Sequence, residues 1–115
     1  MTADRTSDRL SLAIEHLQTA IEYARRGREV FFDRSVPDTR LLVEAELRKA
    51  YEALNRLGDS FFRSQPRIDR SRIGEVRQRL THDYTIVRPK EVWSLVTDEA
   101  PRLLRTLRPI RPPKV

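Results

Sequence analysis

The chain has 115 residues, carries a formal net charge of +6 and contains no cysteine. Without cysteine there is neither a disulfide framework nor a thiolate metal site, and His16 and His82 are too distant in sequence to show the spacing of metal ligands, so we expect no metal and no cofactor. No apolar run is long enough to cross a bilayer, and the first residues lack the blocks of a signal peptide, which predicts a cytoplasmic protein that does not enter the membrane.

Apolar residues recur at helical spacing and glycine occurs only three times, which predicts an all-α fold, an antiparallel helical bundle in one domain. The first helix is expected to begin with Ser7 or Asp8 as its N-cap and to end near Gly27. A short helical turn is expected over residues 28–33, before Pro37 interrupts the chain. The stripe of the first helix consists of Leu10, Ala13, Ile14, Leu17, Ile21 and Ala24.

A second long helix is predicted from apolar residues that alternate four and three apart, as they do where helices pack lengthwise in a bundle. Its members are Val43, Leu47, Ala50, Leu54, Leu57 and Phe61. A loop around Pro66 follows. The next helix is expected to begin at about Ser71, with three residues facing inward, namely Ile73, Val76 and Leu80.

Two further helices are expected after residue 88, one over residues 89–99 and one over residues 101–107. The first of them places three side chains inward, Val92, Trp93 and Val96. The residues after Leu107, Arg-Pro-Ile-Arg-Pro-Pro-Lys-Val, cannot continue a helix. We therefore expect a helical domain over residues 1–107 and an extended basic tail over residues 108–115.

Residues 77–84, Arg-Gln-Arg-Leu-Thr-His-Asp-Tyr, place a cation, an imidazole and a phenol within one segment, here called the 77–84 motif. A guanidinium binds phosphate through two donors in a fixed fork, and an imidazole gives and takes a proton near neutral pH. Arg77 lies beside the buried stripe of its helix, so we expect it to be partly buried or in an interface. His82 points away from that stripe on an ideal helix, so the two side chains meet either through a distorted last turn or across two subunits.

Positive charge is concentrated in the half of the chain that contains this motif. Residues 1–62 hold 10 basic and 11 acidic side chains, a net charge of −1, whereas residues 63–115 hold 13 basic and 6 acidic side chains, a net charge of +7. This distribution favours a polyanion as ligand, although a solvated arginine-rich surface has the same composition. Four arginines recur every three residues and form either a ridge that tracks RNA or a solvated face, namely Arg102, Arg105, Arg108 and Arg111.

The spacing Arg-x4-His-x-Tyr, with Asp83 before the tyrosine, resembles the signature of the HEPN ribonucleases, and in particular of the HepT toxins. The segment over residues 90–103 looks like a second family pattern, V-W-x-I-V followed by D-x-x-P-x-L, and Glu52-Ala53 matches a Glu-Ala pair in an earlier helix. The resemblance covers about residues 8–107. Two positions depart from the family: Gln78 replaces an asparagine, which moves the amide by one methylene, and Tyr51 stands where glycine is common, which implies looser helix packing or an added contact.

The resemblance implies a metal-independent endoribonuclease that acts as the toxin of a toxin–antitoxin pair. In that interpretation His82 either takes the proton of the ribose 2′-hydroxyl or protonates the departing 5′-oxygen. Arg77 stabilises charge on the transition state. Because each chain has one such histidine, a two-fold homodimer would supply a second His82 to one cleft. RNA is the expected substrate.

The resemblance also implies that Tyr84 is the acceptor of AMP transferred by a partner nucleotidyltransferase, the MntA-like antitoxin. An added AMP would place an anion in a basic cleft and block RNA. Gln78 and Arg79 are expected to support the site or to bind RNA, and Asp83 either orients His82 or is an incidental surface acid.

Two alternatives use the same residues differently. In the first, the chain is a non-catalytic helical partner of a nucleotidyltransferase, with Arg77 and His82 in the interface. In the second, it is a basic dimer that binds RNA and does not cleave it. His16, on the first helix, is interpreted as a partly exposed structural residue.

Overall fold

Helices account for all regular secondary structure in residues 2–82 and 89–110, the ranges that the computed structural model describes; the side chains of residues 2–4 and 82 lie outside this description. The predicted all-α class is thereby confirmed. The segments are α1 (Thr2–Ala24), α2 (Arg28–Phe31), α3 (Asp38–Asn55), α4 (Asp59–Ser64), α5 (Arg70–His82), α6 (Pro89–Ser94), a π-helical turn η1 (Leu95–Glu99), α7 (Ala100–Leu107) and a 3-10 turn η2 (Arg108–Ile110).

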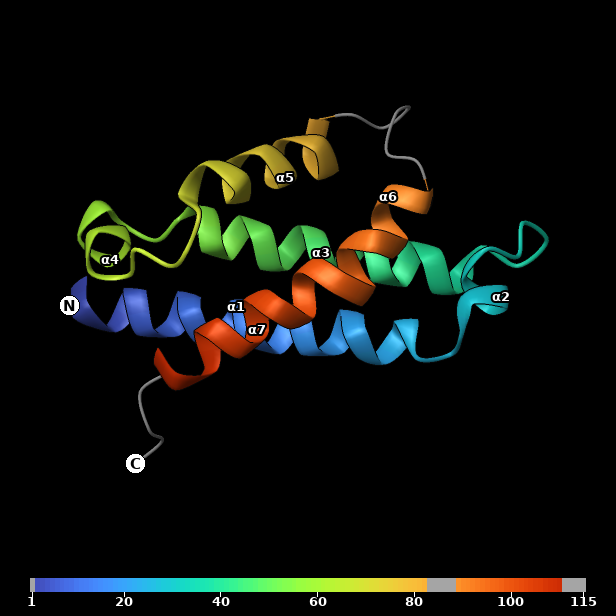
Figure 1. Cartoon of the computed structure of the whole chain (residues 1–115), viewed down its shortest axis with the longest axis horizontal. Coiled ribbons are helices and arrows are strands. Elements are labelled where there is room, and N and C mark those ends of the chain that lie inside the picture. The colour runs from blue at the N-terminus through green and yellow to red at the C-terminus, as the bar shows by residue number, and fades with distance from the viewer. Residues whose placement is uncertain (1, 83–88, 111–115) are drawn as a thin grey trace.

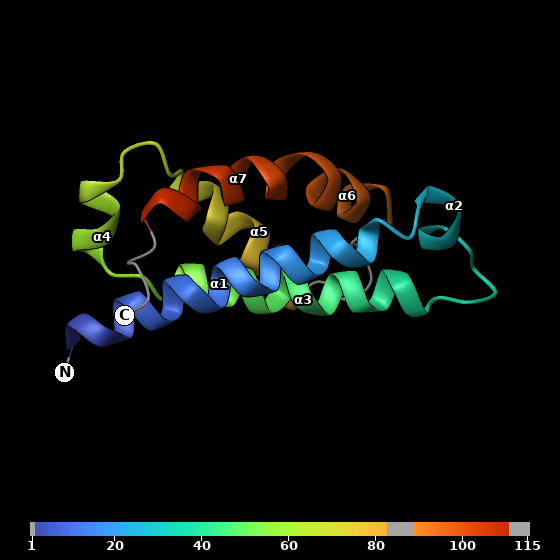
Figure 2. The same ribbon diagram turned by 90° about the horizontal axis from the view of Figure 1, so that it is seen from below.

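α1 and α3 run antiparallel and form one layer of the molecule (Figures 1 and 2). Near the start of α1 the Arg9 Nη1 donates to the carbonyl of Arg56 at 2.8 Å, and beyond its end the Arg26 Nη1 donates to Oγ1 of Thr39 at 3.1 Å. The predicted start of α1 at Ser7 or Asp8 is wrong, since the helix begins at Thr2. Nothing among the first residues ends a helix, because they include neither glycine nor proline.

The predicted continuous helix through Phe61 is also wrong: α3 ends at Asn55 and α4 begins after Gly58. The amide of Leu57 donates to the carbonyl of Leu54, three residues back, which tightens the last turn, and Gly58 then adopts an extended conformation. The reason is local, because glycine weakens a helix and the chain can turn there. Leu57 and Phe61 are nevertheless both buried, so their expected role in the core is correct.

α5 and the segment from α6 to α7 pack on this first layer (Figure 2). The two helices predicted over residues 89–99 and 101–107 form one continuous rod, because Ser94 and Glu99 both have helical backbone angles. The π turn lies just before Pro101, where the missing N–H already removes a helical hydrogen bond. The α-helix ends at Leu107 and Arg108–Ile110 continue as a 3-10 turn; the boundary of the basic tail stays a prediction, with residues 111–115 outside the description.

An aromatic group joins α2 to α6. The ring of Phe31 lies 5.0 Å from that of Trp93 and 4.9 Å from that of Phe32, measured between centroids. The short turn predicted over residues 28–33 is therefore present, and it follows Gly27, whose φ of 114° is one that glycine adopts without strain. Trp93 is half-buried and packs against the core, as expected.

Tyr51, the departure from the family pattern in α3, is part of the core. Its side chain is 1% exposed, and its hydroxyl has no hydrogen-bond partner among the described residues. Burial raises the pKa of this phenol above its ordinary value. The tyrosine thus adds a packed ring rather than an added polar contact. Within residues 2–82 and 89–110, no helix combines the length and the apolar character that crossing a membrane would need.

Candidate active site

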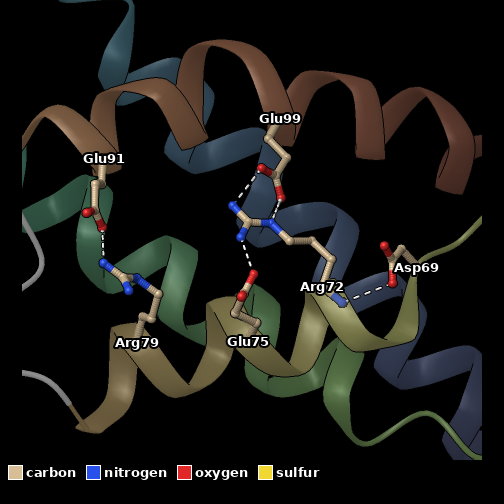
Figure 3. Close-up of polar contacts among 6 residues, drawn as sticks. All are labelled: Asp69, Arg72, Glu75, Arg79, Glu91 and Glu99. Carbon is tan, nitrogen blue, oxygen red and sulfur yellow. Dashed lines mark hydrogen bonds and ion pairs between the residues drawn. The ribbon is translucent and has the colours of Figure 1, made fainter.

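α5, which contains the start of the 77–84 motif, is fixed at its beginning by a cap and along its length by apolar packing. Asp69 accepts a hydrogen bond from the backbone N–H of Arg72 at 3.0 Å, as a capping aspartate does at a helix N-terminus (Figure 3). The side chains of Ile73, Val76 and Leu80 are buried, as predicted from their spacing. The helix therefore has one defined face toward the core, and the motif residues are positioned relative to that face.

Arg77 is anchored on α3 by a carboxylate. Its Nε donates to Oε1 of Glu52 at 3.0 Å, and its side chain is 33% exposed. The expectation that Arg77 is partly buried is confirmed. Since the contact uses only Nε, the two terminal nitrogens of Arg77 have no hydrogen-bond partner among the described residues. This arrangement fixes the plane of the guanidinium and leaves donors for a ligand.

α3 holds the last turn of α5 through two residues, Arg48 and Glu52, which are four apart and so share one face of the helix. The Nε of Arg48 donates to the carbonyl of Leu80 at 3.2 Å, and the Oγ1 of Thr81 lies 3.5 Å from Oε1 of Glu52. A cation at the C-terminal end of a helix also interacts favourably with the helix dipole. The last described turn of α5 is thus held by contacts from a neighbouring helix as well as by its own hydrogen bonds.

The opposite side of α5 faces the rod of α6, η1 and α7 through ion pairs (Figure 3). Arg72 forms two hydrogen bonds to Glu99, at 2.8 and 2.9 Å, and the hydrogen bond to Glu99 raises the pKa of Arg72 further above its ordinary value. Arg79 donates to Glu91 at 2.5 Å. A cavity of about 450 Å³ lies between these elements. Each of these two arginines is therefore already neutralised by a carboxylate.

The structure brings only some of the predicted site residues together. Arg77 is held by Glu52, whereas Gln78 and Arg79 are exposed. His82 is the last residue of α5, but its side chain, together with Asp83 and Tyr84, lies outside the described residues. Whether Arg77 and His82 converge, and the state of Tyr84, therefore stay predictions.

Sequence reasoning missed two residues that hold the site, Arg48 and Thr81. Arg48 bonds a backbone carbonyl 32 positions away, and such a contact leaves no mark on local spacing. The available signal was that Arg48 and Glu52 are four apart on one helix, which places both beside the same neighbour.

His16 lies away from α5 and contacts Glu46, with 2.8 Å between Nδ1 and Oε1. Burial acts to raise the pKa of Glu46, but hydrogen bonds from His16 and Lys49 outweigh it and keep the pKa below its ordinary value. The half-buried position of His16 agrees with a structural role. In the described part of the chain, no three His, Cys, Asp or Glu side chains are grouped so that they could hold a metal ion.

Comparison with known proteins assigns the chain to a family. The family model described as "Ribonuclease HepT-like" matches residues 13–110, which includes every helix described above except the first turns of α1. Neither the curated proteins nor the solved structures gave a match to the chain. Because the family model spans most of the chain and includes Glu52 and the 77–84 motif, the chain belongs to the HepT-like ribonuclease family.

Proposed function

We propose that the chain is a metal-independent endoribonuclease and the toxin of a HepT/MntA-type toxin–antitoxin pair. The observation that carries this proposal is the state of Arg77, whose Nε is held by Glu52 while its terminal nitrogens have no partner among the described residues. A guanidinium fixed at one edge is prepared to bind a phosphate through two parallel hydrogen bonds. Its partial exposure lets a strand of RNA reach it.

The proposed reaction uses the 2′-hydroxyl of the substrate as nucleophile. His82 takes the hydroxyl proton, and the 2′-oxygen forms a bond to the adjacent phosphorus. The bond from phosphorus to the 5′-oxygen breaks, and that oxygen takes up a proton, so the products are a 2′,3′-cyclic phosphate and a 5′-hydroxyl end. Arg77 stabilises the negative charge of the phosphorane-like transition state. Since the nucleophile belongs to the RNA, the reaction does not require a metal-bound water.

The reaction needs a base that takes the proton of the 2′-hydroxyl and an acid that protonates the 5′-oxygen. It is most efficient when two different side chains do this. The proposed assembly is a two-fold homodimer in which the α5 helices of both protomers lie near the axis, so that the partner's histidine completes the site. Such a dimer has a formal charge of +12, twice the +6 of one chain. Gln78 and Asp83 are proposed to position the substrate and His82. Arg79 is a weaker candidate for RNA binding, because it pairs with Glu91.

The proposed regulation is covalent. The phenol oxygen of Tyr84 attacks the α-phosphorus of ATP on the partner nucleotidyltransferase, pyrophosphate leaves, and the tyrosine carries AMP. The added phosphate is negative and lies next to the cationic motif, where it competes with RNA. Family membership supports this proposal, as does the place of Tyr84 two residues after His82.

The test is incubation of the purified chain with RNA in the presence of EDTA, followed by analysis of the ends. We expect cleavage with cyclic phosphate and 5′-hydroxyl ends, and none when the same oligonucleotide carries 2′-deoxyribose throughout. Products with 3′-hydroxyl ends, or cleavage of the deoxy substrate, would contradict the mechanism. Loss of cleavage in His82→Ala by about 10²–10⁴ in rate, with the helical circular dichroism unchanged, would identify the proton-transfer residue.

A further inference from the structure

A groove between α1 and α3 collects cations from both helices. It forms a cavity of about 330 Å³ whose lining includes four basic side chains, Arg9, Arg48, Lys49 and Arg56. Leu12 also belongs to the lining, and 48% of its surface is exposed. Three of these four cations come from the C-terminal half of α3 and its cap, namely Arg48, Lys49 and Arg56. The lining of the groove therefore comes from two packed helices and not from a single segment.

The cations of this groove are weakly neutralised. Glu52 is the only carboxylate among the described residues that line it, and its nearer oxygen lies 3.9 Å from Arg56. Arg9 donates to the carbonyl of Arg56, and Arg48 donates to the carbonyl of Leu80. Within the described ranges, neither Arg9 nor Arg48 has a carboxylate at ion-pair distance. Lys49 pairs with Glu46, outside the lining, at 3.3 Å, so three cations, Arg9, Arg48 and Arg56, face the single carboxylate of Glu52, which also holds Arg77.

The groove is continuous with the candidate active site. Arg48 and Glu52 line the groove, and the same two side chains contact α5, at Leu80 and at Arg77. A ligand in the groove therefore has as a neighbour Glu52, the carboxylate that holds Arg77. Along α3 the groove spans residues 48 to 56, about 12 Å at ~1.5 Å per residue. That length is enough for a short run of backbone phosphates of a single strand.

We propose that the α1/α3 groove is a phosphate-binding subsite that holds a single strand of RNA beside Arg77. This inference rests on the proposed ribonuclease function and names where its substrate extends. The lining favours a polyanion over an apolar protein surface, because its outermost side chains are charged: Lys49 is 58% and Arg56 is 68% exposed. The exposed Leu12 adds an apolar contact for a ribose or the face of a base.

The experiment measures RNA binding by the full-length chain with the His82→Ala substitution, so that cleavage does not interfere. A fluorescein-labelled single-stranded RNA of twelve nucleotides is titrated by fluorescence anisotropy between 50 and 300 mM salt. The test variant adds Lys49→Gln and Arg56→Gln, two exposed positions whose ion pairs are within α3. The matched control adds Arg25→Gln and Arg34→Gln, which remove the same charge from exposed positions near α2, at the other end of the bundle (Figure 1).

We expect the groove variant to bind RNA at least tenfold more weakly than the parent, and its plot of log affinity against log salt to be shallower by about 1.4, which is ~0.7 for each of two contacts. The control variant should match the parent. Equal weakening in both variants would overturn the subsite, since only net charge would then matter. Loss of neutralisation by the antitoxin without loss of RNA binding would also overturn it, because the groove would then hold a protein.

Cleavage by the chain with His82 intact separates this inference from the proposed function. If that chain cleaves RNA and the groove substitutions change neither binding nor cleavage, the subsite is wrong and the ribonuclease stands. If RNA binding depends on the groove but no cleavage occurs, the subsite stands and the ribonuclease is wrong. Absence of RNA binding by the parent overturns both.

Discussion

The two sides of α5 use arginine in opposite ways. Toward the rod of α6, η1 and α7, Arg72 and Arg79 are each paired with glutamates of that rod (Figure 3). Toward α3, Arg77 is held through Nε alone, and its terminal nitrogens have no partner in the described part of the chain. The same residue type on one helix therefore serves as a cross-link on one side and as a prepared ligand site on the other. The number of arginines in a segment says less about phosphate binding than their remaining donors do.

Substitution of Arg77 should have the largest effect on RNA cleavage. We expect Arg77→Ala to lower the rate of RNA cleavage by about 10²–10³, the loss typical for removal of one preorganised donor to a developing charge. Arg77→Lys should not restore the rate, because lysine lacks the planar fork. The control is Arg72→Ala on the other side of α5. The folded molecules of this variant should cleave RNA at the rate of the parent chain. Equal losses in both variants would refute the division between the two sides.

Glu52 should have the next largest effect, because it acts through Arg77 rather than on RNA. Glu52→Ala should lower kcat by about 10-fold to 100-fold with little change in KM, since a misplaced guanidinium is costly in the transition state. Glu52→Gln should recover most of the rate, because an amide oxygen still accepts from Nε of Arg77. Steady-state kinetics on a short RNA distinguish the two variants. Identical kinetics for Ala and Gln would show that the carboxylate charge matters rather than the anchor.

On the other side, the ion pair of Arg72 and Glu99 should affect stability and not rate. A double-mutant cycle of Arg72→Gln and Glu99→Gln, measured by urea unfolding, should give a coupling of about 1 kcal/mol. That value lies at the upper end for exposed pairs, because the contact is bidentate while Arg72 is 41% exposed and screened by solvent. A coupling near zero would mean that the pair orders side chains without holding α5 to the rod.

Tyr51→Phe should give an effect as small as that of the ion pair, but in the direction of greater stability. The buried hydroxyl has no partner among the described residues, so its removal should raise the free energy of unfolding by about 1 kcal/mol at pH 7. The pKa of Tyr51 is raised in the folded chain, so its contribution is complete below pH 10 and is lost as pH rises above 10. The loss of stability between pH 8 and pH 11, measured by unfolding at the two pH values, should therefore be smaller in Tyr51→Phe than in the parent chain. A loss of stability in this variant would indicate a hydrogen bond to the hydroxyl.

The buried stripes of the helices could be predicted from the sequence, but the ends of the helices could not. The four-three spacing of α3 continues through Leu57 and Phe61, and both residues are buried even though the chain turns at Gly58. Periodicity reports which side chains face the core, and a short turn can preserve that pattern while it breaks the helix. Helix ends depend on glycine and on capping, which are weaker signals.

For the site, spacing predicted the half-buried position of Arg77, whereas its partner Glu52 was singled out only by family resemblance. Arg48 and Thr81 were not predicted, because their contacts join helices about thirty residues apart. Charge counted along the chain gives a net value and does not show which cations are paired. The second half has the larger positive charge, but several of its cations are paired with carboxylates, namely Arg70, Arg72, Arg79 and Arg102.

The π turn over residues 95–99 allows the last rod to keep an unusual spacing of core residues. Four of them, each four positions apart, are buried: Val92, Val96, Ala100 and Leu104. On an ideal α-helix each such step overshoots a full turn by about 40°, so Val92 and Ala100 would differ by about 80°. A π turn takes more residues per turn and absorbs that excess. A chain shorter by one residue between these two positions would have a spacing of seven, which suits an unbroken α-helix. The turn therefore marks a place where the length of the protein can change by one residue without moving the core on either side.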